Sequence, residues 1–234
     1  KVAEKNLCAD VDAFLAAVTD KTKILFLANP NNPTGSYLPL SELKRLRAGL
    51  PGHVLLVLDG AYAEFVTADD YSPGIELVDA SDNVVMTRTF SKIYGLGGLR
   101  LGWSYCPPEV ADVLNRIRNP FNVSAIAQAA GLAALEDTDF VAKALTDNEA
   151  LRAWTTEKLT SIGLTVPPSV ANFVLVRFPL DEDKNAEAAD AFIKSKGIIV
   201  RRIGGYGLPD SLRISIGVQD EMTALVDALS EFMS

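Results

Sequence analysis

Short apolar runs alternate with amphipathic stretches through the first two-thirds of the chain. The runs that we predict to be strands are Ile24–Ala28, Val54–Leu58, Val84–Thr87 and Leu99–Tyr105. The first three are continuously apolar, which is typical of strands covered on both faces. The predicted helices are Asp10–Val18, Ser41–Leu50 and Pro108–Arg118, with Ser41 as an N-cap. This alternation indicates an α/β layer with a mostly parallel sheet and helices on both of its faces.

The pattern changes in the last third of the chain. Two long helices are predicted first, at Ser124–Leu135 and Thr138–Ile162. Shorter elements follow: strands at Asn172–Phe178, Ile198–Ile203 and Leu212–Ile216, and helices at Ala186–Lys196 and Gln219–Met233. This mixture favours a smaller α+β domain. We place the boundary inside the second long helix, which gives domains at residues 1–145 and 146–234.

Composition narrows the possible classes of protein. The 234 residues include 22 Lys and Arg against 30 Asp and Glu, a formal charge of −8, which argues against nucleic acid or an anionic membrane surface as partner. No apolar run of about 18 residues is present, so no transmembrane helix is predicted. Two cysteines form no disulfide framework, which favours a reducing compartment and a cytoplasmic location. The single histidine, His53, excludes sites that need two His ligands, and we expect no metal site.

Two predicted strands end in residues that can bind a ligand. After the first comes Asn29-Pro30-Asn31-Asn32-Pro33-Thr34-Gly35, a rigid turn in which Pro33 keeps Asn32 extended. After the second come Asp59 and, three residues on, Tyr62. Ligands of open α/β sheets bind at the carboxyl ends of strands, and a buried carboxylate there needs a cation. The alternatives are a plain strand-ending turn and an Asp that caps the next helix.

A third cluster follows the third strand, and a fourth lies near the end of the chain. Lys92 is flanked in the sequence by Thr89, Ser91 and Arg100. Two hydroxyls together with a guanidinium are suited to bind a phosphate group. A cation beside a lysine favours the neutral amine, the form that makes Schiff bases. Arg213 alternates with apolar neighbours on a strand and suits a carboxylate or phosphate, with Arg201 on the preceding strand. The alternatives are a solvated lysine and a surface arginine.

The order and spacing of these clusters resemble the fold-type I pyridoxal-phosphate aminotransferases. Within them the chain is most similar to the histidinol-phosphate aminotransferase family. The motifs that carry this resemblance are the Asn29–Gly35 turn, Ser91-Lys92, Pro120–Ser124, and Tyr206–Pro209 leading into Leu212-Arg213-Ile214. The resemblance covers essentially the whole chain, and its motifs are more specific for fold and cofactor than for substrate.

The resemblance implies a role for each candidate residue. Lys92 would bind pyridoxal 5'-phosphate as a Schiff base and move the substrate proton, and Asp59 would pair with the pyridine nitrogen. The other cofactor-binding residues would be Asn32 and Tyr62 at the phenolic oxygen, and Thr89, Ser91 and Arg100 at the phosphate. Arg213 would bind the acidic group of the substrate, and Arg201 would help with a dianionic phosphate.

The family also implies the partners. The amino donor would be a phosphorylated amino alcohol or amino acid, with histidinol phosphate the first choice, and the acceptor a 2-oxo acid, with 2-oxoglutarate expected. Whole family members are about one-third longer, and the resemblance begins within a domain. We therefore expect a fragment that lacks an N-terminal part of the cofactor pocket, has little activity alone, and is homodimeric when whole.

Two other classes of protein have the same motifs. A threonine-phosphate decarboxylase has the same fold and cofactor but breaks the bond to the carboxylate. An aminotransferase-like sensor domain of a transcription regulator binds the cofactor without turnover. The complete residue set, including Lys92 and Arg213, favours an enzyme.

Overall fold

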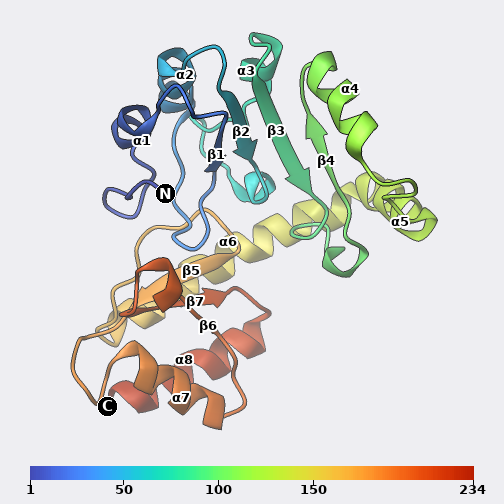
Figure 1. Ribbon diagram of the computed structural model, residues 1–234. Coiled ribbons are helices and arrows are strands. Elements are labelled where there is room, and N and C mark those ends of the chain that lie inside the picture. Colours follow the sequence, from blue (N-terminus) through green and yellow to red (C-terminus); the bar gives the residue numbers. More distant parts are fainter. The chain divides into compact units, whose positions relative to one another are not determined.

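Two sheets organise the chain, one in each of two units (Figure 1). The structure is a computed structural model that describes all residues from Lys1 to Ser234. The first unit comprises Lys1–Asn31 and Ser36–Ala142, and the second comprises Asn32–Gly35 and Lys143–Ser234. The division falls within α6 (Thr138–Ser161), the helix in which the sequence placed the domain boundary. The second unit also includes Asn32–Gly35 of the Asn29–Gly35 turn, which the sequence did not predict.

The sheet of the first unit has the order β1-β2-β3-β4. Its strands are β1 (Ile24–Ala28), β2 (Leu55–Asp59), β3 (Val84–Thr89) and β4 (Gly102–Tyr105). The first three are parallel and β4 is antiparallel to β3, so the predicted mostly parallel α/β layer is confirmed. The last strand begins three residues later than predicted, because Gly97–Leu99 forms the 3-10 helix η2 and Arg100 adopts a left-handed backbone with φ of 53°.

Three helices cover one face of this sheet: α1 (Val11–Ala17), α2 (Leu40–Gly49) and α3 (Ile75–Asp79). Their apolar side chains pack on alternate strand positions, such as Leu56 of β2 and Met86 of β3, both fully buried. A short 3-10 helix, η1 (Ala63–Phe65), follows β2. The predicted helix between the first two strands is thus confirmed, and α3 was missed because it spans little more than one turn.

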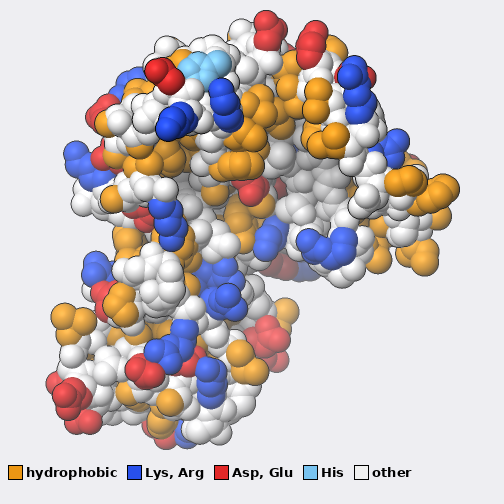
Figure 2. All heavy atoms as spheres, in the orientation of Figure 1, with side chains coloured by type: hydrophobic (Ala, Val, Ile, Leu, Met, Phe, Trp, Pro, Cys, Tyr) orange, Lys and Arg blue, Asp and Glu red, His pale blue; other side chains and the backbone are white.

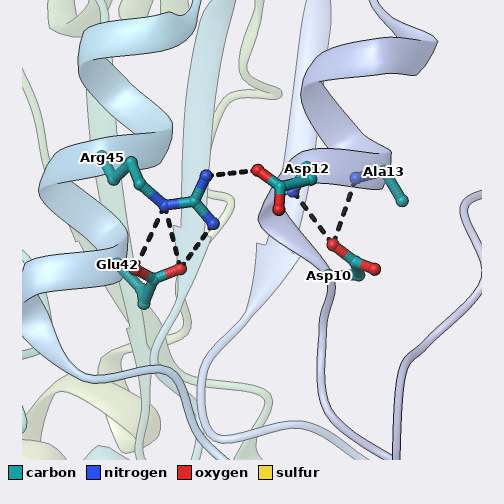
Figure 3. Close-up of polar contacts among 5 residues, drawn as sticks. All are labelled: Asp10, Asp12, Ala13, Glu42 and Arg45. Carbon is teal, nitrogen blue, oxygen red and sulfur yellow. Dashed lines mark hydrogen bonds and ion pairs between the residues drawn. The ribbon is translucent and has the colours of Figure 1, made fainter.

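Polar contacts define the start of α1 and join it to α2 (Figure 3). The carboxylate of Asp10 accepts hydrogen bonds from the backbone amides of Asp12 and Ala13, and so caps α1. Arg45 of α2 pairs with Asp12 and with Glu42, the latter at 2.7 Å.

The prediction of Ser41 as the N-cap of α2 was wrong. The helix begins at Leu40 after Pro39, and no side chain caps it. The first N–H, that of Leu40, instead donates to the backbone carbonyl of Asp70 at 2.8 Å. A tertiary contact therefore replaces the local cap.

The opposite face of the sheet is open at β1. Leu25 and Leu27 point to the covered face and are buried, whereas Ile24 is 49% exposed and Phe26 is 67% exposed. The expectation that this strand is covered on both faces was therefore wrong for this chain. The cause is that α1, α2 and α3 all pack on the same face.

The first unit continues with α4 (Pro108–Ile117) and α5 (Ala125–Glu136). Figure 2 shows hydrophobic side chains gathered at the surface over α5. The most exposed apolar residues of this region are Ile117, Phe121, Ile126 and Leu132, between 65% and 98% exposed. No helix of the structure is long and apolar enough to span a bilayer.

The second unit has an antiparallel sheet with the order β5-β7-β6. Its strands are β5 (Phe173–Arg177), β6 (Arg201–Arg202) and β7 (Ser211–Ser215), and its helices after α6 are α7 (Ala186–Ser195) and α8 (Gln219–Met233). Residues of both helices, among them Ile193 and Leu225, share a buried core with the strands. The predicted α+β arrangement is present, but β6 is much shorter than the predicted Ile198–Ile203, because only two of its residues pair with β7.

Gly74 precedes α3 and offers a test of the packing on β2. Its φ is +101°, and a Cβ there would lie 2.3 Å from Cδ1 of Leu58. We expect Gly74→Ala to lower the free energy of unfolding by about 1 kcal/mol from backbone strain and about 1–3 kcal/mol from overpacking. Gly52→Ala is the control, because a Cβ at Gly52 meets nothing within 4 Å. Thermal unfolding of the two variants measures the difference, and equal melting temperatures would contradict the packing described.

Candidate functional site

Asp59 ends β2 beside the carboxyl end of β3. It is in register with Thr87, and the amide of the next residue, Gly60, donates to the Thr87 carbonyl at 2.9 Å. The Asp59 carboxylate accepts from the amide of Ala61 at 3.1 Å and forms no ion pair within the chain. The expectation that this carboxylate is buried was wrong, because the side chain lies at the strand end and is exposed.

Tyr62 and Lys92 lie together at this edge of the sheet. Tyr62 follows β2 and is only 5% exposed. The Nζ atom of Lys92 lies 4.9 Å from the centre of the Tyr62 ring. Two candidate residues that are 30 positions apart in the sequence are therefore neighbours, at a distance typical of a cation–π contact.

A closed loop carries Lys92 together with the candidate phosphate-binding residues. The amide of Phe90 donates to the carbonyl of Leu101 at 3.0 Å, which brings the two ends of the loop together. Within it, the amide of Ser91 donates to the Thr89 hydroxyl at 3.0 Å. The guanidinium of Arg100, the residue before Leu101, donates to the carbonyl of Gly97 at 2.7 Å and is exposed. Thr89, Ser91, Lys92 and Arg100 thus stand on one short stretch of backbone at the end of β3.

Asn32 is held by residues of the second unit. The amide of Val170 donates to the carbonyl of Gly35 at 2.9 Å, and a Cβ at Gly35 would lie 2.1 Å from the Ser169 hydroxyl oxygen. The guanidinium of Arg213 donates from Nη1 to Oδ1 of Asn32 at 2.7 Å. Because the amide oxygen accepts from arginine, the amide nitrogen is the atom that remains to donate to a ligand.

Arg213 and Arg201 lie directly opposite each other on β7 and β6. The guanidinium carbon of Arg213 is 5.0 Å from the centre of the Phe173 ring, and its Nε is buried without a hydrogen-bond partner. Both arginines line a cavity of about 650 Å³ in the second unit. Two like charges at directly opposite strand positions destabilise a sheet, and a buried donor without a partner, here Nε of Arg213, adds to that cost. An anionic ligand between the two arginines would offset both effects.

One charged pair beside the site was missed by the sequence analysis. Arg88 of β3 and Glu64 of η1 form an ion pair of 2.7 Å, with side chains 14% and 11% exposed. A signal was present in the sequence, because Arg88 directly precedes the candidate Thr89 in a predicted strand that begins with apolar residues. Such a residue needs a partner, but the sequence alone does not say which.

The predicted residues therefore divide between the units. The first unit brings together Asp59, Tyr62, Thr89, Ser91, Lys92 and Arg100 at the ends of β2 and β3. The second unit holds Asn32, Arg201 and Arg213. No group of three or more His, Cys, Asp or Glu side chains is placed to hold a metal ion.

Known proteins are similar to this chain in sequence and in fold. The chain matches the family described as Aminotransferase class I and II over residues 2–229. It is 62% identical over 230 residues to a histidinol-phosphate aminotransferase of Paramagnetospirillum magneticum and 58% identical to one of Rhodospirillum centenum, covering 98% of this chain and 63% of each relative.

A solved structure agrees with these matches. It is a histidinol-phosphate aminotransferase from Sinorhizobium meliloti in complex with pyridoxal-5'-phosphate, with a TM-score of 0.88 and 36% identity, over 98% of this chain and 62% of that one. The chain thus spans less than two-thirds of the length of these relatives. It belongs to the family of class I and II aminotransferases.

Proposed function

We propose that the whole protein is a pyridoxal-phosphate-dependent histidinol-phosphate aminotransferase that transfers an amino group between the phosphorylated donor and 2-oxoglutarate in histidine biosynthesis. The names of the relatives at 58–62% identity support the substrate, and the pyridoxal-5'-phosphate complex of the Sinorhizobium enzyme supports the cofactor. The observation that carries the proposal is the grouping of Lys92, Tyr62 and Asp59 at adjoining strand ends.

The side chains of the first unit fit the cofactor chemically. The Asp59 carboxylate has no cation of this chain beside it and suits a protonated ring nitrogen. The amine of Lys92 suits covalent attachment, and the hydroxyls of Thr89 and Ser91 with the Arg100 guanidinium suit the phosphate. Tyr62 would supply a hydrogen-bond donor for the phenolic oxygen, and Asn32, which belongs to the second unit, is proposed as a further donor.

Each residue then has a defined task. Bound pyridoxal phosphate supplies the electron sink for carbanion chemistry at the substrate Cα. Asp59 would hold the ring nitrogen in its protonated form, and the Lys92 amine would accept the proton from the substrate Cα. Arg213 binds the acidic group of the substrate, and Arg201 adds a second charge for a dianionic phosphate.

Two other functions use the same residues. A threonine-phosphate decarboxylase orients the substrate carboxylate for cleavage, and a sensor domain binds the cofactor without turnover. The identity to named histidinol-phosphate aminotransferases favours the transferase. Product analysis with each phosphorylated substrate separates the three, because release of carbon dioxide indicates the decarboxylase and absence of turnover indicates the sensor.

We further propose that the whole protein is a cytoplasmic homodimer. The exposed apolar side chains over α4 and α5 supply surface that a second subunit can bury, and Cys8 and Cys106 are free thiols, as expected in a reducing compartment. Analytical ultracentrifugation of the full-length protein tests the oligomeric state.

Lys92→Ala removes the amine that binds the cofactor. We expect borohydride reduction with pyridoxal phosphate to add one cofactor mass to the full-length wild type, on the peptide that contains Lys92, and none to this variant. Transamination by the variant is expected to be undetectable. Lys196→Ala, which changes an exposed lysine paired with Glu231, is the control and should behave as wild type. A wild type without an adduct would overturn the proposed function.

Asp59→Asn keeps the shape of the side chain and removes its charge. An amide cannot hold the ring nitrogen protonated, so we expect kcat to fall by about 10²-fold or more while reduction still labels Lys92. Steady-state kinetics with labelling of the same sample measures both. Unchanged kcat would show that Asp59 does not act on the ring.

Arg201→Met tests recognition of the phosphate. Loss of one charge-assisted contact is expected to raise KM for histidinol phosphate by about 10-fold or more, with little effect on a donor that lacks the phosphate. Arg202→Met is the matched control, because Arg202 is adjacent on β6 but pairs with Glu187 at 3.0 Å. Equal effects on phosphorylated and unphosphorylated donors would contradict the role of Arg201.

A further inference from the structure

The ion pair between Glu64 and Arg88 joins the two segments that carry the candidate cofactor residues. Nη2 of Arg88 lies 2.7 Å from Oε1 of Glu64, and Nε lies 3.2 Å from the same oxygen. Glu64 stands two residues after Tyr62 and five after Asp59. Arg88 precedes Thr89 and lies four residues before Lys92. The pair thus links a side chain of η1 to a side chain of β3.

Burying this ion pair costs free energy, which argues against a purely stabilising role. Its side chains are only 14% and 11% exposed, and Oε2 of Glu64 is buried without a hydrogen-bond partner. Desolvation of two charges offsets much of their attraction, and an unsatisfied oxygen adds to that cost. Apolar side chains of this size would fill the space at lower cost, which favours a role of the pair in the geometry of the site.

Gly60 and Trp103 define the space that the Arg88 side chain occupies. A Cβ at Gly60 would lie 3.1 Å from Cδ of Arg88 and 3.2 Å from the Thr87 carbonyl oxygen, so the absence of a side chain there leaves room for the arginine. The guanidinium carbon lies 5.9 Å from the centre of the Trp103 ring, on the strand paired with β3. Glycine on one side and an aromatic ring on the other restrict where the guanidinium lies.

Both charges act on two neighbouring tyrosines, Tyr94 and Tyr71. Burial raises the pKa of Tyr94, two residues after Lys92, and the Glu64 charge raises it further while Arg88 opposes the shift. Burial likewise raises the pKa of Tyr71, where Arg88 lowers it and Glu64 raises it. The two charges therefore act in opposite directions on these tyrosines, and loss of one leaves the other buried charge uncompensated.

We propose that Glu64 and Arg88 are positioning residues, whose ion pair holds Tyr62 and Lys92 in the relative placement that binds the cofactor. The backbone bond between Gly60 and Thr87 aligns the strand ends, and the ion pair ties η1, which continues beyond β2, to the end of β3. This inference rests on the proposed function, because it assigns a role toward the same cofactor.

Glu64→Gln in the full-length protein tests the inference. The amide keeps the shape and an acceptor oxygen but removes the charge. We expect the dissociation constant for pyridoxal phosphate to rise by about tenfold and kcat at saturating cofactor to fall by about tenfold. The KM for the amino donor should stay within about twofold of the wild-type value. Arg88→Lys keeps the charge but not the fork of donors, and should retain more of both properties than Arg88→Met.

Asp190→Asn is the matched control for a merely structural role. Asp190 is also buried, pairs with Lys194 at 2.6 Å, and has an Oδ1 without a partner, but it lies on α7 of the second unit. It should lower the melting temperature and leave cofactor affinity unchanged. All measurements are made well below the melting temperature of each variant.

The double variant Glu64→Gln/Arg88→Met covers the case in which one unpaired charge unfolds the protein. It removes both charges and the associated desolvation cost. Weak cofactor binding by a stable double variant supports positioning, and wild-type affinity overturns it. If the wild type itself binds no pyridoxal phosphate, the proposed function fails; if it binds and Glu64→Gln binds equally well, only the positioning role fails.

Discussion

In the first unit, β2 and β3 run side by side in the same direction, and Asp59 and Thr87 are in register at their carboxyl ends. Every candidate cofactor residue of this unit is placed by that pairing. Tyr62 follows one strand after a tight turn, and Lys92 follows the other within a loop closed against β4. A shift of one residue between these strands would move every side chain of the shifted strand to the other face and separate these groups.

The strand pairing itself follows from residues that are visible in the sequence. Leu56, Leu58, Val84 and Met86 fall on one face and are buried under the helices, which is why continuous apolar runs predicted these strands well. In the second unit, α8 was predicted with the correct bounds, and α7 was predicted one residue too long at its end.

Features that depend on tertiary contacts were not predictable in the same way. The start of α2 depends on the Asp70 carbonyl, and β6 is limited by how much of it pairs with β7. The exposure of Phe26 depends on what covers the sheet, which the strand's own sequence does not record. For the site, residue types at strand ends indicated candidates, but the Asn32–Arg213 bond and the Glu64–Arg88 pair join residues far apart in the chain, and no local pattern reports them.

The Asn32 amide oxygen accepts from Arg213, which leaves its NH2 group as the donor for a ligand, and conversion of the amide to a carboxylate would remove that donor. Asparagine side chains deamidate when the backbone nitrogen of the following residue attacks the amide carbon and ammonia leaves. Here the following residue is Pro33, and Asn29 is likewise followed by Pro30. Proline has no N–H, so its nitrogen is a poor attacker. The prolines that shape this turn therefore also protect Asn29 and Asn32 from spontaneous deamidation over the lifetime of the protein.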